Sequence, residues 1–197
     1  MRKGFTLVEL LIVIVVIGVL SAMMMLSSTE AVSTAKASNI ISNLTNLKKA
    51  VVAWYVNNLS RVVKLRNSNN TADEYKILNK GNPQTKYTIS EFLKNGNGSA
   101  EILKYLNNTP ISLKAKDNSN EGDYIFIGID FSKHWYICYN VGNGKSTNAR
   151  LKEKLASRAK SIGLFGTDDI NLNGSTAMEK SYYTNQKFAV LPILKLE

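Results

Sequence analysis

The residue whose chemistry stands out first is Glu9, a carboxylate inside an otherwise apolar run. Between Phe5 and Leu26 it is the only charged side chain. An ionised carboxylate in hydrocarbon costs about 2.5 to 3.5 kcal/mol or more, so such a residue generally has both a partner and a function. We therefore expect a specific group to neutralise Glu9.

Outside this run the sequence offers little for catalysis. Among its 197 residues the chain has one cysteine, Cys138, and one histidine, His134, which leaves neither an internal disulfide nor a zinc cluster. It contains no glycine-rich phosphate-binding motif and no nucleophile elbow. We predict that the protein is not an enzyme, that Cys138 is a small buried hydrophobic residue, and that His134 lies at the surface beside a hairpin turn.

The chain is basic, with a formal charge of +10 and a pI near 9.6. Such a charge is typical of proteins that meet anionic partners, but it also serves solubility alone. One segment that is expected to be helical concentrates basic residues: Arg150, Lys152, Lys154, Arg158 and Lys160. Contact with DNA and a solvated helix face are both compatible with this pattern.

The apolar run is long enough to cross a membrane, because about 22 helical residues span roughly 33 Å. Arg2 and Lys3 precede it, so the positive-inside rule keeps the N-terminus cytoplasmic and sends the following chain outward. The run is longer than the apolar stretch of a secretory signal, and no small-x-small site follows it closely. We expect the segment to remain in the mature protein.

The stretch KGFTLVELLIVIVVIGVL resembles the N-terminus of type IV pilins and pseudopilins. The resemblance lies in a short basic leader, Gly4, Phe5, Thr6, Glu9 as the fifth mature residue, and an apolar run containing Gly18. It implies that a prepilin peptidase cuts between Gly4 and Phe5 and methylates the new amino terminus. It covers about the first 30 residues, and Leu26 stands where many members have proline.

Cleavage after Gly4 would create an α-amino group on Phe5, four residues before Glu9. We expect this amine to pair with Glu9, either within one subunit or, as the favoured arrangement, from a neighbouring subunit. A simple bitopic anchor is the alternative interpretation of the segment, but it needs neither Gly4 nor a carboxylate.

A second candidate site is the segment DINLNG, which resembles the start of an EF-hand loop. Asp169, Asn171 and Asn173 alternate before Gly174, but Lys180 takes the place of the bidentate glutamate, which excludes a standard EF-hand. Two interpretations stay open. One is a looser calcium loop, such as some pseudopilins of secretion systems have near their C-termini, and the other is a plain turn without any cofactor.

The elements that would position these residues start with one helix from about Phe5 to about Lys64, since residues 27–66 contain no proline or glycine. Its second half has an apolar stripe at three- and four-residue steps, formed by Ile40, Leu44, Leu47, Val51 and Trp54 or Tyr55.

The segment DYIFIGIDFSKHWYICYNVG predicts a hairpin that packs on this stripe. Its expected inner face consists of Ile125, Ile127 and Ile129 on one strand and Trp135, Ile137, Tyr139 and Val141 on the other. Short helices are expected at ISEFLKN and SAEILKYLNN, the second with Ser99 as N-cap. A longer helix should end at Gly163, and Pro192 should mark an edge or a bulge in the last strand.

These elements predict an α+β protein in which a long N-terminal helix packs on an antiparallel β-sheet with short accessory helices, and the resemblance implies that this fold is pilin-like. We divide the chain into a cleaved leader (1–4), an apolar transmembrane or filament-core helix (5–27), its amphipathic continuation (28–66) and a C-terminal β-sheet domain (67–197).

By this resemblance the protein is a structural subunit of a type IV pilus or a related filament, located in the membrane first and at the cell surface after assembly. Its predicted partners are further copies of the chain, prepilin peptidase and the assembly machinery. A pseudopilin of a type II secretion or DNA-uptake machine is one alternative, and a surface adhesin with an uncleaved anchor is another.

Overall fold

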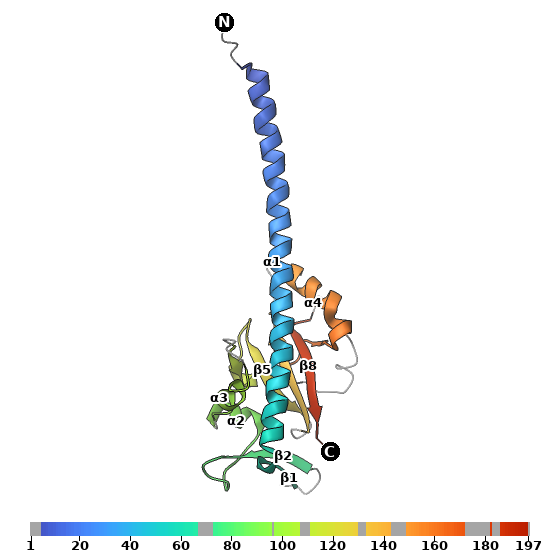
Figure 1. Ribbon diagram of the computed structural model, residues 1–197. Coiled ribbons are helices and arrows are strands. Elements are labelled where there is room, and N and C mark those ends of the chain that lie inside the picture. The colour runs from blue at the N-terminus through green and yellow to red at the C-terminus, as the bar shows by residue number, and fades with distance from the viewer. Residues whose placement is uncertain are drawn as a thin grey trace.

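One 51-residue helix, α1 (Leu7–Asn57), extends along the computed structural model, and the other elements gather around its second half (Figure 1). The structure describes residues 5–66, 73–95, 97–106, 111–129, 133–142, 149–171, 182 and 186–196. At 1.5 Å per residue α1 is about 77 Å long. Within the described residues it is the one helix that is long and apolar enough to cross a membrane.

The helix α1 ends at Asn57, earlier than the lack of proline and glycine suggests. The side-chain amides of Asn57 and Asn58 each donate, at 2.8 Å, to the backbone carbonyl four residues before them, which satisfies acceptors at the helix end. A 3-10 turn, η1 (Leu59–Arg61), and strand β1 (Val62–Arg66) follow. Residues 62–66 are therefore a strand and not the last turn of the predicted helix.

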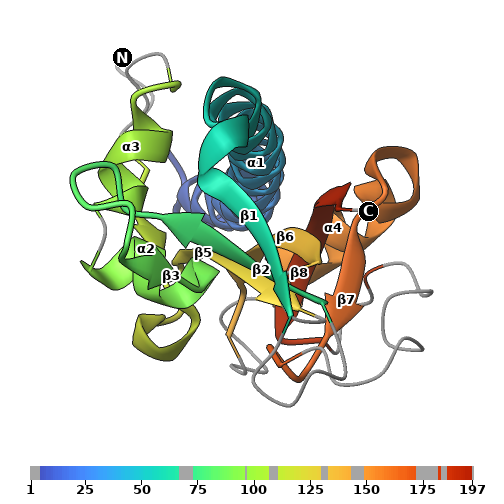
Figure 2. The same ribbon diagram turned by 90° about the horizontal axis from the view of Figure 1, so that it is seen from below.

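A small antiparallel sheet with the order β1, β2, β3 lies at the end of α1 that is remote from the N-terminus (Figures 1 and 2). Its other strands are β2 (Asp73–Leu78) and β3 (Lys86–Tyr87). The short helices α2 (Ile89–Asn95) and α3 (Gly98–Leu103) confirm the prediction for this region.

The N-cap of α3 is Asn97, so the prediction of Ser99 at this position was wrong. The Ser99 hydroxyl lies within the helix and donates to the backbone carbonyl of Leu113 at 2.8 Å, which connects α3 to strand β4 (Leu113–Lys114).

The larger sheet has five strands in the order β4, β5, β6, β8, β7, with β4 parallel to β5 and the other pairs antiparallel. The strands are β4 (Leu113–Lys114), β5 (Tyr124–Ile129), β6 (His134–Asn140), β7 (Phe165–Thr167) and β8 (Phe188–Lys195). A 3-10 turn, η2 (Lys116–Asn118), precedes β5, and helix α4 (Ala149–Ile162) connects β6 to β7. Viewed along α1, the long helix lies over these strands, with α2 and α3 at one flank and α4 at the other (Figure 2).

Two local predictions for this region are confirmed. Gly163 follows α4 with a φ of 68°, the left-handed conformation that suits a helix end. Pro192 lies opposite Tyr136, where the pairing between β6 and β8 shifts register.

The apolar stripe of α1 packs on this sheet as predicted, and its five main residues are each 6% exposed or less: Ile40, Leu44, Leu47, Val51 and Trp54. The β6 residues Trp135 and Ile137 join the same cluster, as does Val141 directly after the strand, and Tyr139 packs against it.

The predicted inner face of β5 was wrong. Phe126, not its isoleucine neighbours, pairs with Ile137 and enters the core under α1, while Ile125 pairs with Cys138. A shift of one residue moves every side chain of a strand to the opposite face. Ile125 and Ile127 thus lie with Cys138 in a second cluster on the outer face of the sheet, and the side chain of Ile129 lies outside the described part of the structure.

A polar network fastens the end of α1 to the globular part. The guanidinium of Arg61 donates to the carboxylate of Glu101 at 2.6 Å, and the indole of Trp54 donates to the same oxygen at 3.1 Å. The Arg61 and Glu101 side chains are only 13% and 19% exposed. Burial raises the pKa of Glu101, but the hydrogen bonds from Arg61 and Trp54 outweigh it and hold this pKa below its ordinary value of 4.5.

Replacing Glu101 should weaken the fold and change its response to acid. We expect Glu101→Gln to lower the free energy of unfolding at neutral pH by about 2 to 4 kcal/mol, because Arg61 loses its charge partner. The folded pKa of Glu101 is below its ordinary value, so the contribution is complete above about pH 4.5 and disappears as the pH falls through the folded value. Urea unfolding of the full chain in detergent at several pH values measures both effects.

The control is Glu153→Gln, which removes an exposed glutamate from α4. It should leave both the stability and the acid slope unchanged. If Glu101→Gln lost stability below pH 5 as steeply as the wild type, the network would not be the source of this acid sensitivity.

Candidate functional site

The partner of Glu9 within the chain is Thr6, the N-cap residue of α1. The backbone N–H and the hydroxyl of Thr6 both donate to Oε2 of Glu9, at 2.8 Å each. In return the Glu9 N–H donates to the Thr6 hydroxyl at 3.2 Å. This reciprocal arrangement is a capping box, which satisfies N–H groups that the first helical turn leaves without partners.

The sequence carries a signature of this capping box. A threonine, Thr6, is followed three residues later by a glutamate, Glu9, at the start of an apolar run. The predicted ion pair with the α-amine of Phe5 is a different contact, because that amine exists only after cleavage. Among the described residues, the second carboxylate oxygen of Glu9, Oε1, receives no hydrogen bond. The ion pair stays a prediction, and Gly4 lies outside the described residues.

Among the described residues, none packs against the apolar half of α1 (Figure 1). Phe5 is 88% exposed, Ile14 61% and Met24 74%, and the most apolar stretch of the helix has no buried residue. At Gly18, a methyl group would meet nothing within 4 Å, so no contact inside one subunit requires glycine there. Small residues do allow close approach between helices of different subunits.

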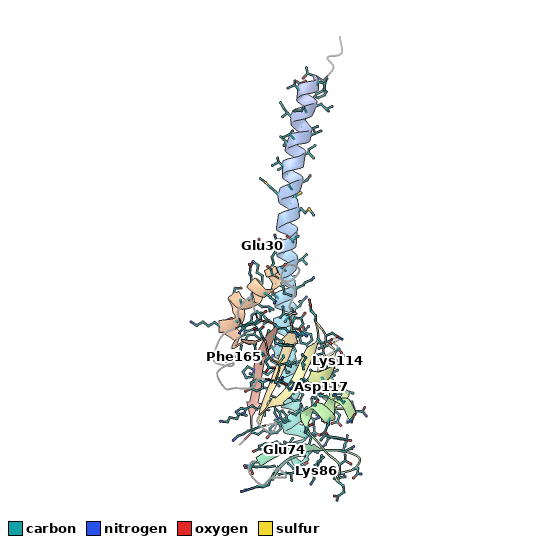
Figure 3. All side chains as sticks on the ribbon, turned by 180° about the vertical axis from the view of Figure 1, so that it is seen from behind. Glu30, Glu74, Lys86, Lys114, Asp117 and Phe165 are labelled. Atoms are coloured by element: carbon teal, nitrogen blue, oxygen red, sulfur yellow. The ribbon has the colours of Figure 1, made fainter. Side chains whose placement is uncertain are left out.

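Helix α4 places the basic residues of the sequence prediction beside α1. Lys154 forms an ion pair with Glu30 at 2.8 Å, and the guanidinium of Arg158 donates to the Ser38 hydroxyl at 2.6 Å. Arg150 donates to the hydroxyl of Thr29. The hydrogen bond from Lys154 and its positive charge lower the pKa of Glu30. Glu30 lies in α1, close to the apolar half of that helix (Figure 3).

The other two basic residues differ in their exposure, since Lys152 is buried and Lys160 is exposed. Three of the five predicted basic residues therefore contact α1, and two of these three, Arg150 and Arg158, are also exposed to solvent. Contact with DNA stays a prediction.

Two of the three candidate calcium residues, Asp169 and Asn171, are hydrogen-bonded to each other. The backbone N–H and the side-chain amide of Asn171 both donate to Oδ1 of Asp169 at 2.8 Å. Asn173 lies outside the described residues. The described part of the chain contains no group of three or more His, Cys, Asp or Glu side chains placed to bind a metal ion. Calcium binding stays a prediction.

The single cysteine and the single histidine both lie in β6. Cys138 is fully buried, as predicted, and its burial raises the pKa of its thiol. His134 is the first residue of β6, is partly buried and stacks on Tyr136 with ring centroids 6.5 Å apart.

Comparison with known proteins identifies the N-terminal segment. Residues 1–25 match the family model of the prokaryotic N-terminal methylation motif, which is the prepilin cleavage motif of type IV pilins and pseudopilins. The match includes Gly4, Phe5, Thr6 and Glu9. No curated protein and no solved structure matches the chain. The chain thus carries the processing motif of the type IV pilin and pseudopilin family on a pilin-like α+β fold.

Loss of the Thr6 hydroxyl should loosen the first turn of α1. We expect Thr6→Ala to cost about 1 kcal/mol of local stability, because the N–H of Glu9 loses its acceptor and Oε2 loses one of two donors. Amide hydrogen exchange of residues 7–10 in detergent micelles should accelerate roughly fivefold.

The control is Ser21→Ala in the same helix, where the hydroxyl only donates to the carbonyl of Ile17. It should leave exchange at residues 7–10 unchanged. Equal exchange in Thr6→Ala and the wild type would contradict a stabilising role for the capping box.

Proposed function

We propose that this protein is a structural subunit of a type IV pilus or pilus-like filament, which waits in the membrane and polymerises through the first half of α1. The observation that carries the proposal is the unburied apolar run of α1, joined to a globular part that is well packed. A surface that is apolar on all sides needs lipid or other helices around it. The prepilin motif over the same residues supports filament assembly.

The capping box gives Glu9 a function at each stage. While the subunit is in lipid, the two hydrogen bonds from Thr6 reduce the cost of the carboxylate. After cleavage, the Phe5 amine of a neighbouring subunit can reach Oε1 without displacing Thr6. A buried ion pair of this kind would fix the axial register between subunits.

The processing motif is common to pili and pseudopili, so it supports either kind of filament. Electron microscopy of cells that produce the protein distinguishes the two, since long surface fibres indicate a pilus.

The mature protein should begin at N-methylated Phe5. Intact-mass and N-terminal peptide measurements on membranes should show the loss of four residues, which takes the formal charge from +10 to +8 because Arg2 and Lys3 are removed. Cells that lack the prepilin peptidase are the control and should retain the full chain. Chains that start only at Met1 would contradict the proposed function and favour an uncleaved anchor. Chains that start only beyond Leu26 would also contradict it, because the apolar run would then be removed from the mature protein.

Two substitutions of Glu9 should separate its charge from its capping hydrogen bonds. Glu9→Gln keeps an acceptor for Thr6 but removes the charge, and Glu9→Ala removes both. We expect both variants, each as the only subunit present, to insert and be processed but to yield at least about tenfold fewer filaments, because an ion pair worth several kcal/mol is lost. Sheared-filament immunoblots measure the yield.

Glu153→Gln, an exposed change on α4, should assemble normally. Normal assembly of Glu9→Gln together with poor assembly of Glu9→Ala would show that the capping box, and not the ion pair, is what assembly requires.

A further inference from the structure

Helix α4 is the element of the globular part that lies nearest to the apolar half of α1 (Figure 1). Arg150 of α4 contacts Thr29 of α1, although the two residues are 121 positions apart in the sequence. The ion pair between Lys154 and Glu30 fixes its first half at the same level (Figure 3). Three side chains of α4 thus fix it beside the segment that follows the apolar run, the third being Arg158 on Ser38.

The depth of these contacts follows from helix geometry. Thr29 and Glu30 lie three and four residues beyond Leu26, about 5 to 6 Å further along the helix axis. The headgroup layer on each side of a bilayer is about 5 to 8 Å thick. If the apolar run spans the hydrocarbon, Arg150 and Lys154 lie at the depth of the lipid phosphates.

The charge of α4 suits an anionic surface. Its described residues include five basic side chains and one acidic side chain, Glu153, a net charge of +4. Arg150, Arg158 and Lys160 are exposed, and Lys154 is partly exposed. The hydrogen bond from Arg150 to Thr29 uses one of the five N–H donors of a guanidinium. These charges are too far along the chain from the apolar run to affect its topology.

We propose that the first half of α4 binds the headgroups of anionic phospholipids in the membrane that holds α1. The inference rests on the proposed function, in which the subunit waits in the membrane before assembly. The contact sets the depth of the globular part on the bilayer, and extraction into the filament breaks it. Lipid is favoured over DNA because Arg150 and Lys154 are held at headgroup depth, where a duplex would have to enter between protein and bilayer.

The size of the effect follows from the charges. A basic side chain near an anionic membrane contributes roughly a fivefold change in an equilibrium constant, so neutralising two should weaken docking of α4 about thirtyfold. Because the attraction is electrostatic, salt at about 0.5 M should remove most of it.

The test uses the full chain in vesicles of phosphatidylcholine alone or with about 30% phosphatidylglycerol, a fraction that gives a strongly anionic surface. A fluorophore is attached through Ser157→Cys, at an exposed position of α4, while the native Cys138 is buried and unreactive. Lipids with a spin label on the headgroup quench the fluorophore according to its distance from the membrane. We expect stronger quenching in anionic vesicles at low salt, and loss of this difference in Arg150→Gln/Lys154→Gln.

The matched control is Lys86→Gln/Lys104→Gln, which removes two exposed charges, one of them at the far end of the molecule (Figure 3). It should retain the full lipid dependence. Equal quenching in both kinds of vesicle would overturn the proposal. The proposal would also be overturned if Arg150→Gln/Lys154→Gln changed the quenching as much in neutral vesicles as in anionic ones. These side chains would then only hold α4 on α1.

Two further outcomes are distinguishable. If wild-type protein in neutral vesicles bound duplex DNA through Arg150 and Lys154 while showing no lipid dependence, α4 would be a nucleic-acid surface. If the chain did not float with vesicles at all, the proposed membrane-inserted subunit would itself be wrong, whatever the behaviour of α4.

Discussion

The structure depends on the packing of the second half of α1 against the large sheet. Trp54 is at its centre, with ring centroids 5.0 Å from Phe92 and 6.3 Å from Trp135, and with its indole N–H on Glu101. These contacts bring α2, α3 and β6 to one helix and bury its stripe almost completely. Because this packing involves only the second half of α1, the apolar first half of the helix is left exposed by the described residues.

An exposed apolar helix can lie either in lipid or among other helices if its polar groups have hydrogen-bond partners in both environments. The N-terminus of a helix is the difficult point, because its first N–H groups have no acceptors within the helix. The Thr6–Glu9 capping box supplies an acceptor there and at the same time gives the Glu9 carboxylate two donors. A single local motif thus lowers the cost of both the helix end and the charge, whether lipid or other helices surround them.

The sequence predicts well those features that depend on neighbouring residues alone. The apolar run, the stripe from Ile40 to Trp54 and the turn at Gly163 follow from composition and helical period, and the structure confirms them. The end of α1 was misjudged because two asparagines, and not a glycine or proline, end it. The contact between Thr6 and Glu9 also follows from local spacing, because a threonine that precedes a glutamate by three residues is the signature of a capping box.

Features that depend on contacts between distant residues could not be predicted from the local sequence pattern. Both faces of β5 are apolar, so a period of two cannot decide whether Phe126 or Ile125 meets α1, and only the pairing with β6 decides it. The position of α4 is likewise a consequence of topology, since its insertion between β6 and β7 carries it to the side of α1.

This position changes the electrostatics of the junction between the two halves of α1. Among the described residues of α1 between the apolar run and Ala35, Glu30 is the one charged side chain. In the proposed membrane-inserted subunit, Glu30 alone would place a carboxylate next to lipid phosphates and repel them. Lys154 pairs with it, and Arg150 adds a positive charge beside it, so the junction becomes net positive. Helix α4 therefore supplies, from a distant part of the chain, the positive charge that the α1 sequence itself lacks just beyond its apolar run.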